Sequence, residues 1–363
     1  MRHYFLGTAA GISKKERILR RKMTAEREDY EKLTDFLSQY HSGEVRLTRN
    51  GRSAIALGLK YSGIEIGEVI INGFTCRAVV QGVKEAGFTP VYADISRENL
   101  NFSVSDLEKV LSDKTRAVIV QNTLGNMAKI QEIEEFCKKH NLILIEDLAH
   151  SFGLKYSDER EAGMVGKIVI LSFGKEKMLD AGNGGAVIFR GFSPKNLPEL
   201  KKEPPKREEK LSRIYPTIGF FYRISSYIRL EGVFMRLMLK FGLVVKSAEG
   251  EVDLESHLGY FQAKLALKKL KDFRVNGRVL REFYLVNERE KCLKELVRAG
   301  YYFGGFWYEK PVAPERYYEK ANFPEEKCKN AVFISEHIIN FPTYYTKNEL
   351  KKAREIVERY IIK

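Results

Sequence analysis

A short polar run with two lysines stands between two apolar stretches of the sequence. Residues 172–177 read Ser-Phe-Gly-Lys-Glu-Lys, and a glycine-rich run, Gly-Asn-Gly-Gly, begins at Gly182. A lysine amine attacks a carbonyl group once its ammonium is desolvated or lies beside other cations. Lys175 and Lys177 are therefore candidate nucleophiles, although a single lysine in so basic a chain is more often a solvated surface residue. The glycines by themselves indicate only a tight turn.

A second candidate group follows another apolar stretch. Residues 145–150 read Ile-Glu-Asp-Leu-Ala-His, so Asp147 ends the stretch and His150 comes three residues later. Ligands of open α/β sheets bind beyond the carboxyl ends of parallel strands. An aspartate in this place is more often the cap of a helix, so the position alone does not establish a catalytic role.

Two further turns have the composition of a binding site. Gly51, Arg52 and Ser53 open an apolar helix, and the free N–H groups and dipole of a helix N-terminus favour a phosphate group. The Gly-Lys-Ser/Thr signature of a Walker motif is absent, and an ordinary helix cap explains this turn better when it is taken alone. Cys76 lies in the second turn, which follows the apolar run at 69–71.

Short apolar runs alternate with helix-like segments between residues 68 and 190. The predicted strands are mostly continuous apolar runs, as expected for strands covered on both faces, at 69–71, 89–95, 116–121, 142–146, 168–173 and 185–189. Helices are predicted between them at 76–86, 103–111 and 129–140, and Ser103 with Asp106 resembles a capping box. This alternation predicts an α/β fold with a mostly parallel central sheet and helices on both faces.

The alternation of apolar runs and helix-like segments ends after residue 190. Residues 195–213 are rich in Lys, Glu and Pro and predict an exposed linker, and a charged helix is predicted at 347–361. Residues 216–245 combine aromatic and aliphatic side chains with a few charges. On a single helix at about 100° per residue, Arg229, Arg236 and Lys240 share one face, as in helices that lie on an anionic membrane. The alternative is a helical hairpin that buries its apolar face against the sheet or a partner subunit.

The composition excludes several classes of protein. The chain has 363 residues, a net charge of 62 − 48 = +14 and 44% hydrophobic residues, which excludes a mainly disordered chain. The four cysteines match no metal-ligand spacing, so we expect neither a metal site nor a disulfide framework. No segment has the roughly 18 uncharged apolar residues of a bilayer-spanning helix, and we expect a cytoplasmic protein. No recognition motif supports a nucleic-acid partner.

Taken in order, these motifs resemble those of the DegT/StrS-type sugar aminotransferases, a pyridoxal-phosphate-dependent family with the aspartate-aminotransferase fold (fold type I). The family's Glu-Asp-Ala-Ala-His/Gln pattern is similar to residues 146–150, and its Ser-Phe-x-x-x-Lys pattern with Gly-x-Gly-Gly is similar to residues 172–185. The resemblance covers residues 46–190 well and residues from 256 onward more loosely. It implies four parts: an N-terminal helical segment (1–45), a large PLP-binding domain (46–195), a linker with a basic amphipathic helical insertion (196–255) and a small α+β C-terminal domain (256–363).

The resemblance also implies roles for individual residues. Lys177, rather than Lys175, holds the cofactor pyridoxal 5'-phosphate (PLP) through its amine and moves a proton during the reaction. Asp147 pairs with the pyridine nitrogen, and His150 lies beside the ring and its phenolic oxygen. The phosphate cradle consists of Arg52, Ser53 and Ser172. Cys76 occupies the position where relatives often have an aromatic residue that stacks on the ring.

Besides Cys76, two further departures from the family pattern lie close to these motifs. Asn122 replaces a common histidine, and the asparagine that a partner subunit often contributes before the helix at 260–270 is not evident near Glu255 or Ser256. Neither departure removes the lysine or the aspartate.

The activity that the resemblance implies is transfer of an amino group from an amino acid, by family habit glutamate, to a keto-sugar. The sugar is expected to be nucleotide-linked, the pathway surface polysaccharide biosynthesis, and the protein a homodimer. One alternative is a PLP-dependent sugar dehydratase of the same family, in which histidine replaces the lysine; the presence of Lys177 disfavours it. The other is a non-catalytic relative that contacts the inner face of the membrane through 216–245.

Overall fold

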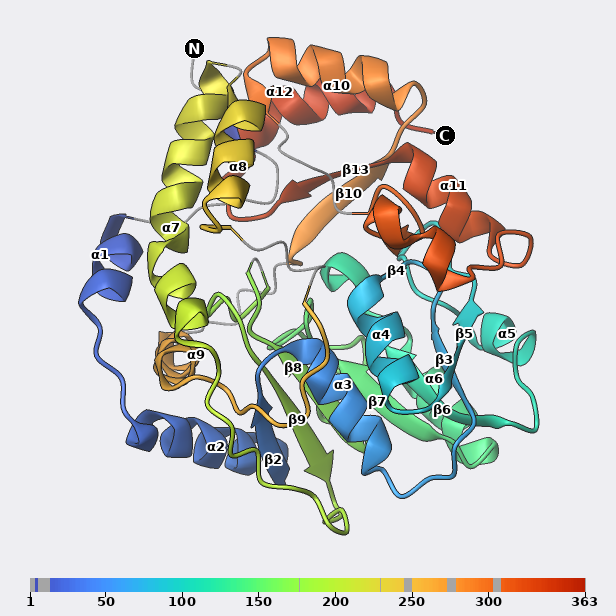
Figure 1. The fold of residues 1–363 in the computed structure, drawn as a ribbon. Helices are drawn as coiled ribbons and strands as arrows, with labels where there is room; N and C mark the ends of the chain where they lie inside the picture. The colour runs from blue at the N-terminus through green and yellow to red at the C-terminus, as the bar shows by residue number, and fades with distance from the viewer. Residues whose placement is uncertain are drawn as a thin grey trace.

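A seven-stranded sheet forms the centre of the molecule (Figure 1), in the order β2-β9-β8-β7-β6-β3-β5. The computed structural model describes residues 4–5, 14–175, 177–228, 230–244, 250–272, 279–302 and 308–362. β9 runs antiparallel to both of its neighbours, and the other pairings are parallel. The predicted α/β fold with a mostly parallel sheet is confirmed. The strands are β2 (Gly43–Thr48), β3 (Glu68–Asn72), β5 (Thr89–Ala93), β6 (Thr115–Val120), β7 (Ile143–Asp147), β8 (Ile168–Ser172) and β9 (Gly185–Arg190).

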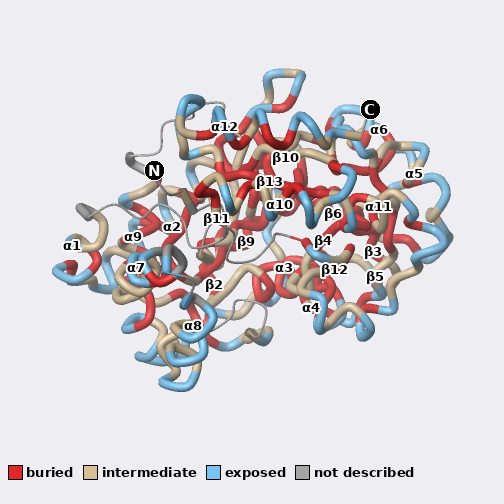
Figure 2. The backbone as a smooth tube through the Cα atoms, turned by 90° about the horizontal axis from the view of Figure 1, so that it is seen from above, coloured by how far each residue is buried: buried red, intermediate tan, exposed pale blue. Residues whose placement is uncertain are grey.

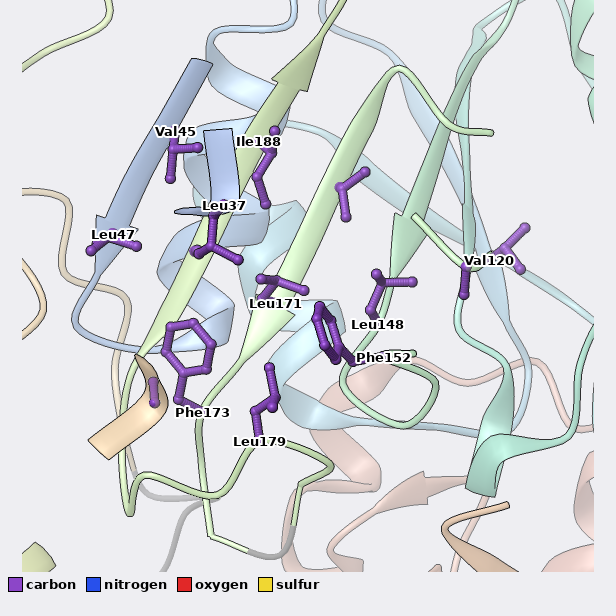
Figure 3. Packing of buried hydrophobic residues seen from close by; sticks show 14 of the residues in the cluster. Leu37, Val45, Leu47, Val120, Leu148, Phe152, Leu171, Phe173, Leu179 and Ile188 are labelled. Carbon is purple, nitrogen blue, oxygen red and sulfur yellow. The ribbon is translucent and has the colours of Figure 1, made fainter. Parts of the chain in front are cut away.

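Helices cover both faces of this sheet because its strands are apolar on both sides. One face packs against α2 (Arg27–His41), α6 (Ile130–Lys139) and α9 (Tyr260–Asp272). Figure 3 shows this layer, with Leu37 of α2 among side chains of the strands. The opposite face packs against α3 (Gly51–Lys60) and α4 (Arg77–Glu85). The two helical layers cover the faces of the sheet, and loops cover the edge at which its parallel strands end.

The predicted capping box is present on this framework. It opens α5 (Val104–Glu108), where the Asp106 carboxylate accepts a hydrogen bond from the Ser103 amide at 3.0 Å. This pairing satisfies N–H groups that the first turn of a helix otherwise leaves unbonded.

The C-terminal third is built around a two-stranded antiparallel sheet. β10 (Arg281–Leu285) pairs with β13 (Ile338–Pro342), flanked by α10 (Arg289–Arg298), α11 (Lys329–His337) and α12 (Lys347–Glu358). Short strand pairs connect this region with other parts of the chain: β1 (Tyr4–Phe5) with β11 (Tyr301–Tyr302), and β4 (Thr75–Cys76) with β12 (Val312–Ala313). The boundaries of the four predicted parts stay predictions.

A helical hairpin projects at one side of the molecule (Figure 1), formed by α7 (Lys206–Tyr227) and α8 (Glu231–Lys240) beside α1 (Lys14–Lys22). The predicted linker over 195–213 is wrong from residue 206 onward. Its charged residues form helix-stabilising pairs four residues apart, such as Arg213 with Glu209 at 2.7 Å.

Of the two alternatives for residues 216–245, the helical hairpin is confirmed and the single helix is wrong. The chain folds back between residues 227 and 231, and Phe234 then packs against Tyr222 with 6.3 Å between the ring centroids. Of the three basic residues predicted to share one face, Arg236 and Lys240 lie on α8. Arg229 itself lies outside the described residues.

His41 is a buried histidine in the last turn of α2. Its Nδ1–H donates to the carbonyl of Gly163 at 3.2 Å, and its Nε2 is buried without a hydrogen-bond partner among the described residues. Burial lowers the pKa of His41 from 6.5 to about 4. The folded protein therefore keeps this side chain neutral in a pH range where the unfolded chain protonates it.

We expect the fold to lose stability through His41 as the pH falls from 6.5 to 4, because only the unfolded chain takes up the proton in this range. At 1.36 kcal/mol per pH unit the loss is about 3 kcal/mol. Urea unfolding at pH 7 and pH 4 measures it against His41→Asn, whose amide can still donate to Gly163 and does not titrate. An equal fall in the free energy of unfolding in both proteins would contradict the prediction.

Candidate active site

The sequence motifs meet at one edge of the central sheet. Asp147 is the last residue of β7, and Ser172 is the last residue of β8. α3 begins at Gly51, shortly after β2 ends, and Cys76 is the N-cap of α4 beyond β3. Because strands that run in the same direction end at the same edge of a sheet, the topology brings these distant residues together.

Lys177 contacts His150 in the loop that follows β8. The Lys177 Nζ lies 2.9 Å from His150 Nε2. The Leu124 amide donates to the other ring nitrogen, Nδ1, at 3.1 Å, so Nδ1 carries a lone pair and the proton of the neutral imidazole is on Nε2. Nε2 faces the Lys177 amine across this contact. A lysine amine with a lone pair is both a nucleophile and a base.

The surroundings of His150 keep its imidazole neutral. The residue is 3% exposed. Burial lowers the pKa of His150 well below its ordinary value, and positive charge on Lys177 or Arg281 lowers it further. The imidazole therefore orients the lysine amine without competing with it for a proton.

Asp147 is buried at the same edge, with 5% of its surface exposed. Its Oδ1 accepts a hydrogen bond from the Ala149 amide at 3.1 Å. Burial raises the pKa of the Asp147 carboxyl group, against the opposing effects of that hydrogen bond and of the Lys177 charge. A carboxylate whose pKa is dominated by desolvation is stabilised by a cationic partner.

Glycines leave room around the Ser172 hydroxyl. A Cβ atom on Gly51, at the start of α3, would lie 3.2 Å from Ser172 Oγ. A Cβ atom on Gly174 would lie 3.4 Å from the same oxygen and 3.8 Å from Lys177 Cγ. Ser172 thus stands between the N-terminus of α3 and the lysine, and it is half-buried.

The Ser53 hydroxyl group both donates and accepts a hydrogen bond. The hydroxyl donates to the side chain of Asn50, the N-cap of α3, at 2.9 Å. It accepts a hydrogen bond from the Asp253 amide, also at 2.9 Å. The segment that follows the helical hairpin therefore crosses the start of α3.

Arg52 is held by the same crossing segment. Its guanidinium donates to the Gly250 carbonyl and to Gln81 Oε1, the latter at 3.0 Å. Arg52 is 7% exposed, and burial lowers its pKa. Arg52 and Ser53, the two predicted cradle residues on α3, are thus hydrogen-bonded to Gly250 and Asp253.

Two of the positions that depart from the family pattern, Cys76 and Asn122, have different surroundings. Cys76 is partly exposed where α4 begins. Asn122 is buried, and its amide group donates to Ser151 Oγ and Tyr156 Oη, both at 3.1 Å. These bonds tie Asn122 into the loop after β6, where it has a structural role.

Two residues that the sequence analysis did not single out lie near the same groups. Tyr308 is buried, and its pKa is raised well above the ordinary value by that burial and further by Cys76 and Asp147. Arg281 is 5% exposed and lies near enough to His150 to lower its pKa. Both come from the C-terminal third, and no local motif marks either of them.

Comparison with known proteins identifies the family. Residues 12–202, more than half of the chain, match the sequence model of the DegT/DnrJ/EryC1/StrS aminotransferase family. The chain belongs to this family. GDP-perosamine synthase of Escherichia coli O157:H7 is 36% identical to this family member over 154 residues, which cover 42% of each protein. The chain therefore spans less than half the length of this curated relative.

Solved structures resemble the chain over nearly its whole length. A protein of Streptococcus pneumoniae in a PLP form has a TM-score of 0.67 at 16% identity, covering 99% of this chain and 100% of the other. The Helicobacter pylori protein PseC, an aminotransferase involved in the biosynthesis of pseudoaminic acid, has a TM-score of 0.64 at 16% identity, covering 99% of each chain. At such identities the likeness establishes the fold alone, and it agrees with the fold type I transferase that the sequence motifs imply.

Proposed function

We propose that this family member is a PLP-dependent aminotransferase that moves an amino group from an amino acid, with glutamate as the expected donor, to a nucleotide-linked keto-sugar. The observation that carries the proposal is the 2.9 Å contact between Lys177 and His150 at the carboxyl edge of the sheet, where Asp147 is buried. Family membership supports the reaction class and the cofactor. The name of the E. coli relative, GDP-perosamine synthase, supports a nucleotide-linked sugar. We further propose a cytoplasmic homodimer that acts in surface polysaccharide biosynthesis.

The residues at the site are suited to PLP at both of its ends. Asp147 is a buried carboxylate that a protonated pyridine nitrogen would neutralise. The N-terminus of α3 and the half-buried Ser172 suit a phosphate group, because helix N-terminal amides and hydroxyl groups bind anions. When bound, PLP supplies an electron sink for the negative charge that develops at the substrate carbon.

Each of the chain's own groups then has a separate task. Lys177 offers an amine that would hold the cofactor and, once released by the substrate, would take the proton from the substrate carbon onto Nζ. His150 keeps this amine in place through their hydrogen bond. Asp147 keeps a negative charge in the position from which it favours a protonated ring nitrogen. Exclusion of water strengthens each of these electrostatic interactions.

The first half of the reaction tests this proposal directly. Glutamate added to the PLP-loaded protein should release 2-oxoglutarate, one per site, and change the visible absorbance. A panel of nucleotide-linked keto-sugars should then restore the original spectrum, and the sugar that does so fastest identifies the substrate class. Failure of every amino acid donor to change the spectrum of a PLP-loaded protein would contradict an aminotransferase.

Ser172→Ala should weaken PLP binding by about tenfold or more, because a hydrogen bond to a charged group contributes roughly 1.5–3 kcal/mol. Titration of the PLP-free protein with PLP, followed by absorbance, measures the dissociation constant. Ser157→Ala removes an exposed hydroxyl group and serves as the control, with no expected change. Equal affinities in the two variants would remove Ser172 from the proposed phosphate cradle.

A further inference from the structure

The helical hairpin of α7 and α8 presents an apolar surface that the proposed chemistry does not use. Among the described residues, twelve large hydrophobic side chains are exposed, and eight of them lie between residues 220 and 241. Exposed apolar patches of this kind mark interaction sites. We call these eight residues the hairpin surface; they are 41% to 66% exposed, and they are Phe220, Phe221, Ile224, Ile228, Leu230, Val233, Leu237 and Phe241.

The hairpin surface consists of one stripe on each helix. At 100° per residue, Phe220, Phe221 and Ile224 of α7 fall within an arc of about 100°, and Val233 and Leu237 of α8 lie about 40° apart. Ile228, Leu230 and Phe241 adjoin the ends of the two helices. The inward side of α7 carries the buried Tyr222 and Ser225. Figure 2 shows α8 at the rim of the molecule, with much of its backbone coloured as exposed. The hairpin is therefore amphipathic, with its apolar stripes turned toward solvent.

Basic residues border the hairpin surface. From 213 to 244 the sequence contains five Arg or Lys residues and a single acidic residue, Glu231. The exposed Arg236 and Lys240 fall on α8 within about 60° of the edge of its apolar stripe. Of the six basic residues of the neighbouring α1, Arg20 is buried and paired with Glu16, whereas the Arg17 guanidinium lies 4.1 Å from the centre of the Phe220 ring. The apolar stripes thus lie in positively charged surroundings.

This charge distinguishes between two kinds of partner. A second copy of the chain seated on the hairpin surface in a symmetric dimer would bring like charges together, which disfavours binding. An anionic bilayer supplies phosphate groups for the basic residues at the depth where apolar side chains enter the acyl boundary. Within the described residues no helix is long and apolar enough to cross a membrane. We propose that the hairpin surface docks this protein onto one leaflet of an anionic phospholipid membrane.

Co-sedimentation of the full-length, PLP-loaded protein with vesicles tests this docking. Phosphatidylcholine vesicles with and without phosphatidylglycerol are compared, at low and high salt. The wild-type protein should partition onto the anionic vesicles and much less onto the neutral ones, and salt should weaken the binding. Amino transfer in solution is measured separately, so failure of membrane docking and failure of the proposed reaction are distinguishable.

Two double variants separate the charged and apolar contributions. Arg236→Glu with Lys240→Glu, and Leu237→Ser with Phe241→Ser, should each lower the partition coefficient at least about tenfold. Lys138→Glu with Lys139→Glu makes the same charge change on the exposed side of α6 and should partition nearly as the wild type does. Circular dichroism and the absorbance of bound PLP show that each variant is folded.

Two outcomes would overturn the proposal. One is equal partitioning of the wild type and both hairpin variants. The other is a lower assembly mass of the Leu237→Ser, Phe241→Ser variant in sedimentation equilibrium without any loss of vesicle binding, which would show that a second copy of the chain covers the hairpin surface.

Discussion

Lys177→Gln is expected to abolish amino transfer and covalent attachment of PLP while leaving the fold intact. Glutamine keeps a polar end group but has no basic lone pair, so it neither condenses with a carbonyl group nor takes up a proton. General acid–base catalysis alone contributes about 10²–10⁴-fold, and the covalent step is lost as well. The rate should therefore fall at least about 10³-fold. Release of 2-oxoglutarate and the visible absorbance of the PLP-loaded protein measure the two losses.

Lys175→Gln is the matched control, because it makes the same change two residues earlier in the same loop. The Lys175 ammonium lies 4.5 Å from the centre of the Tyr215 ring, a cation–π contact that contributes about 0.5–1 kcal/mol at an exposed site. This variant should keep most of its activity. Borohydride reduction of the wild type followed by peptide mapping should find the cofactor on Lys177. Cofactor on Lys175, or a wild-type rate in Lys177→Gln, would overturn the assignment.

The position of the candidate site was predictable because its signals are local in the sequence. β7 and β8 are continuous apolar runs, and each ends in a polar residue, Asp147 and Ser172. The alternation of strands and helices predicts that such ends share one edge of a parallel sheet. The choice of Lys177 as the cofactor-holding lysine rests on the spacing of residues 172–185, which resembles the family motif.

The surroundings of these residues could not be predicted, because they depend on contacts between distant parts of the chain. The tautomer of His150 is set by the amide of Leu124, which adopts its place only when the loop after β6 is folded. Arg281 and Tyr308 approach the site from the C-terminal third, and neither is part of a short motif. Their roles follow from tertiary structure alone.

The sequence left a single helix and a helical hairpin open for residues 216–245, and it did not place the turn between α7 and α8. Helical periodicity continues through residues 216–245, and no glycine or proline stands between the last residue of α7, Tyr227, and the first residue of α8, Glu231. Folding back buries Tyr222 and pairs its ring with Phe234, which a straight helix would leave apart. This contact buries apolar surface and so favours the folded-back conformation.

Asp147→Asn is expected to have the second large effect on amino transfer. Asparagine keeps the shape of the side chain and an acceptor for the Ala149 amide, now bonded at 3.1 Å, but it loses the negative charge. An opposite charge at 4 Å contributes about 4 kcal/mol at an effective dielectric constant of 20, so the rate should fall roughly 10³-fold. The rate of 2-oxoglutarate release at saturating PLP measures this loss, and Asp35→Asn, exposed on α2, is the control with no expected change.

The same substitution should stabilise the protein in the absence of PLP. Burial raises the pKa of Asp147, so the folded state holds its proton more tightly than the unfolded chain does. The wild type therefore loses stability as the pH rises above the ordinary carboxyl pKa of about 3.9. Asparagine has no charge to desolvate, and urea unfolding of the PLP-free proteins at pH 7 should give Asp147→Asn the larger free energy of unfolding. If Asp147 is retained for catalysis at a cost in stability, its replacement lowers the activity and raises the free energy of unfolding. Loss of both stability and activity would instead assign Asp147 a structural role.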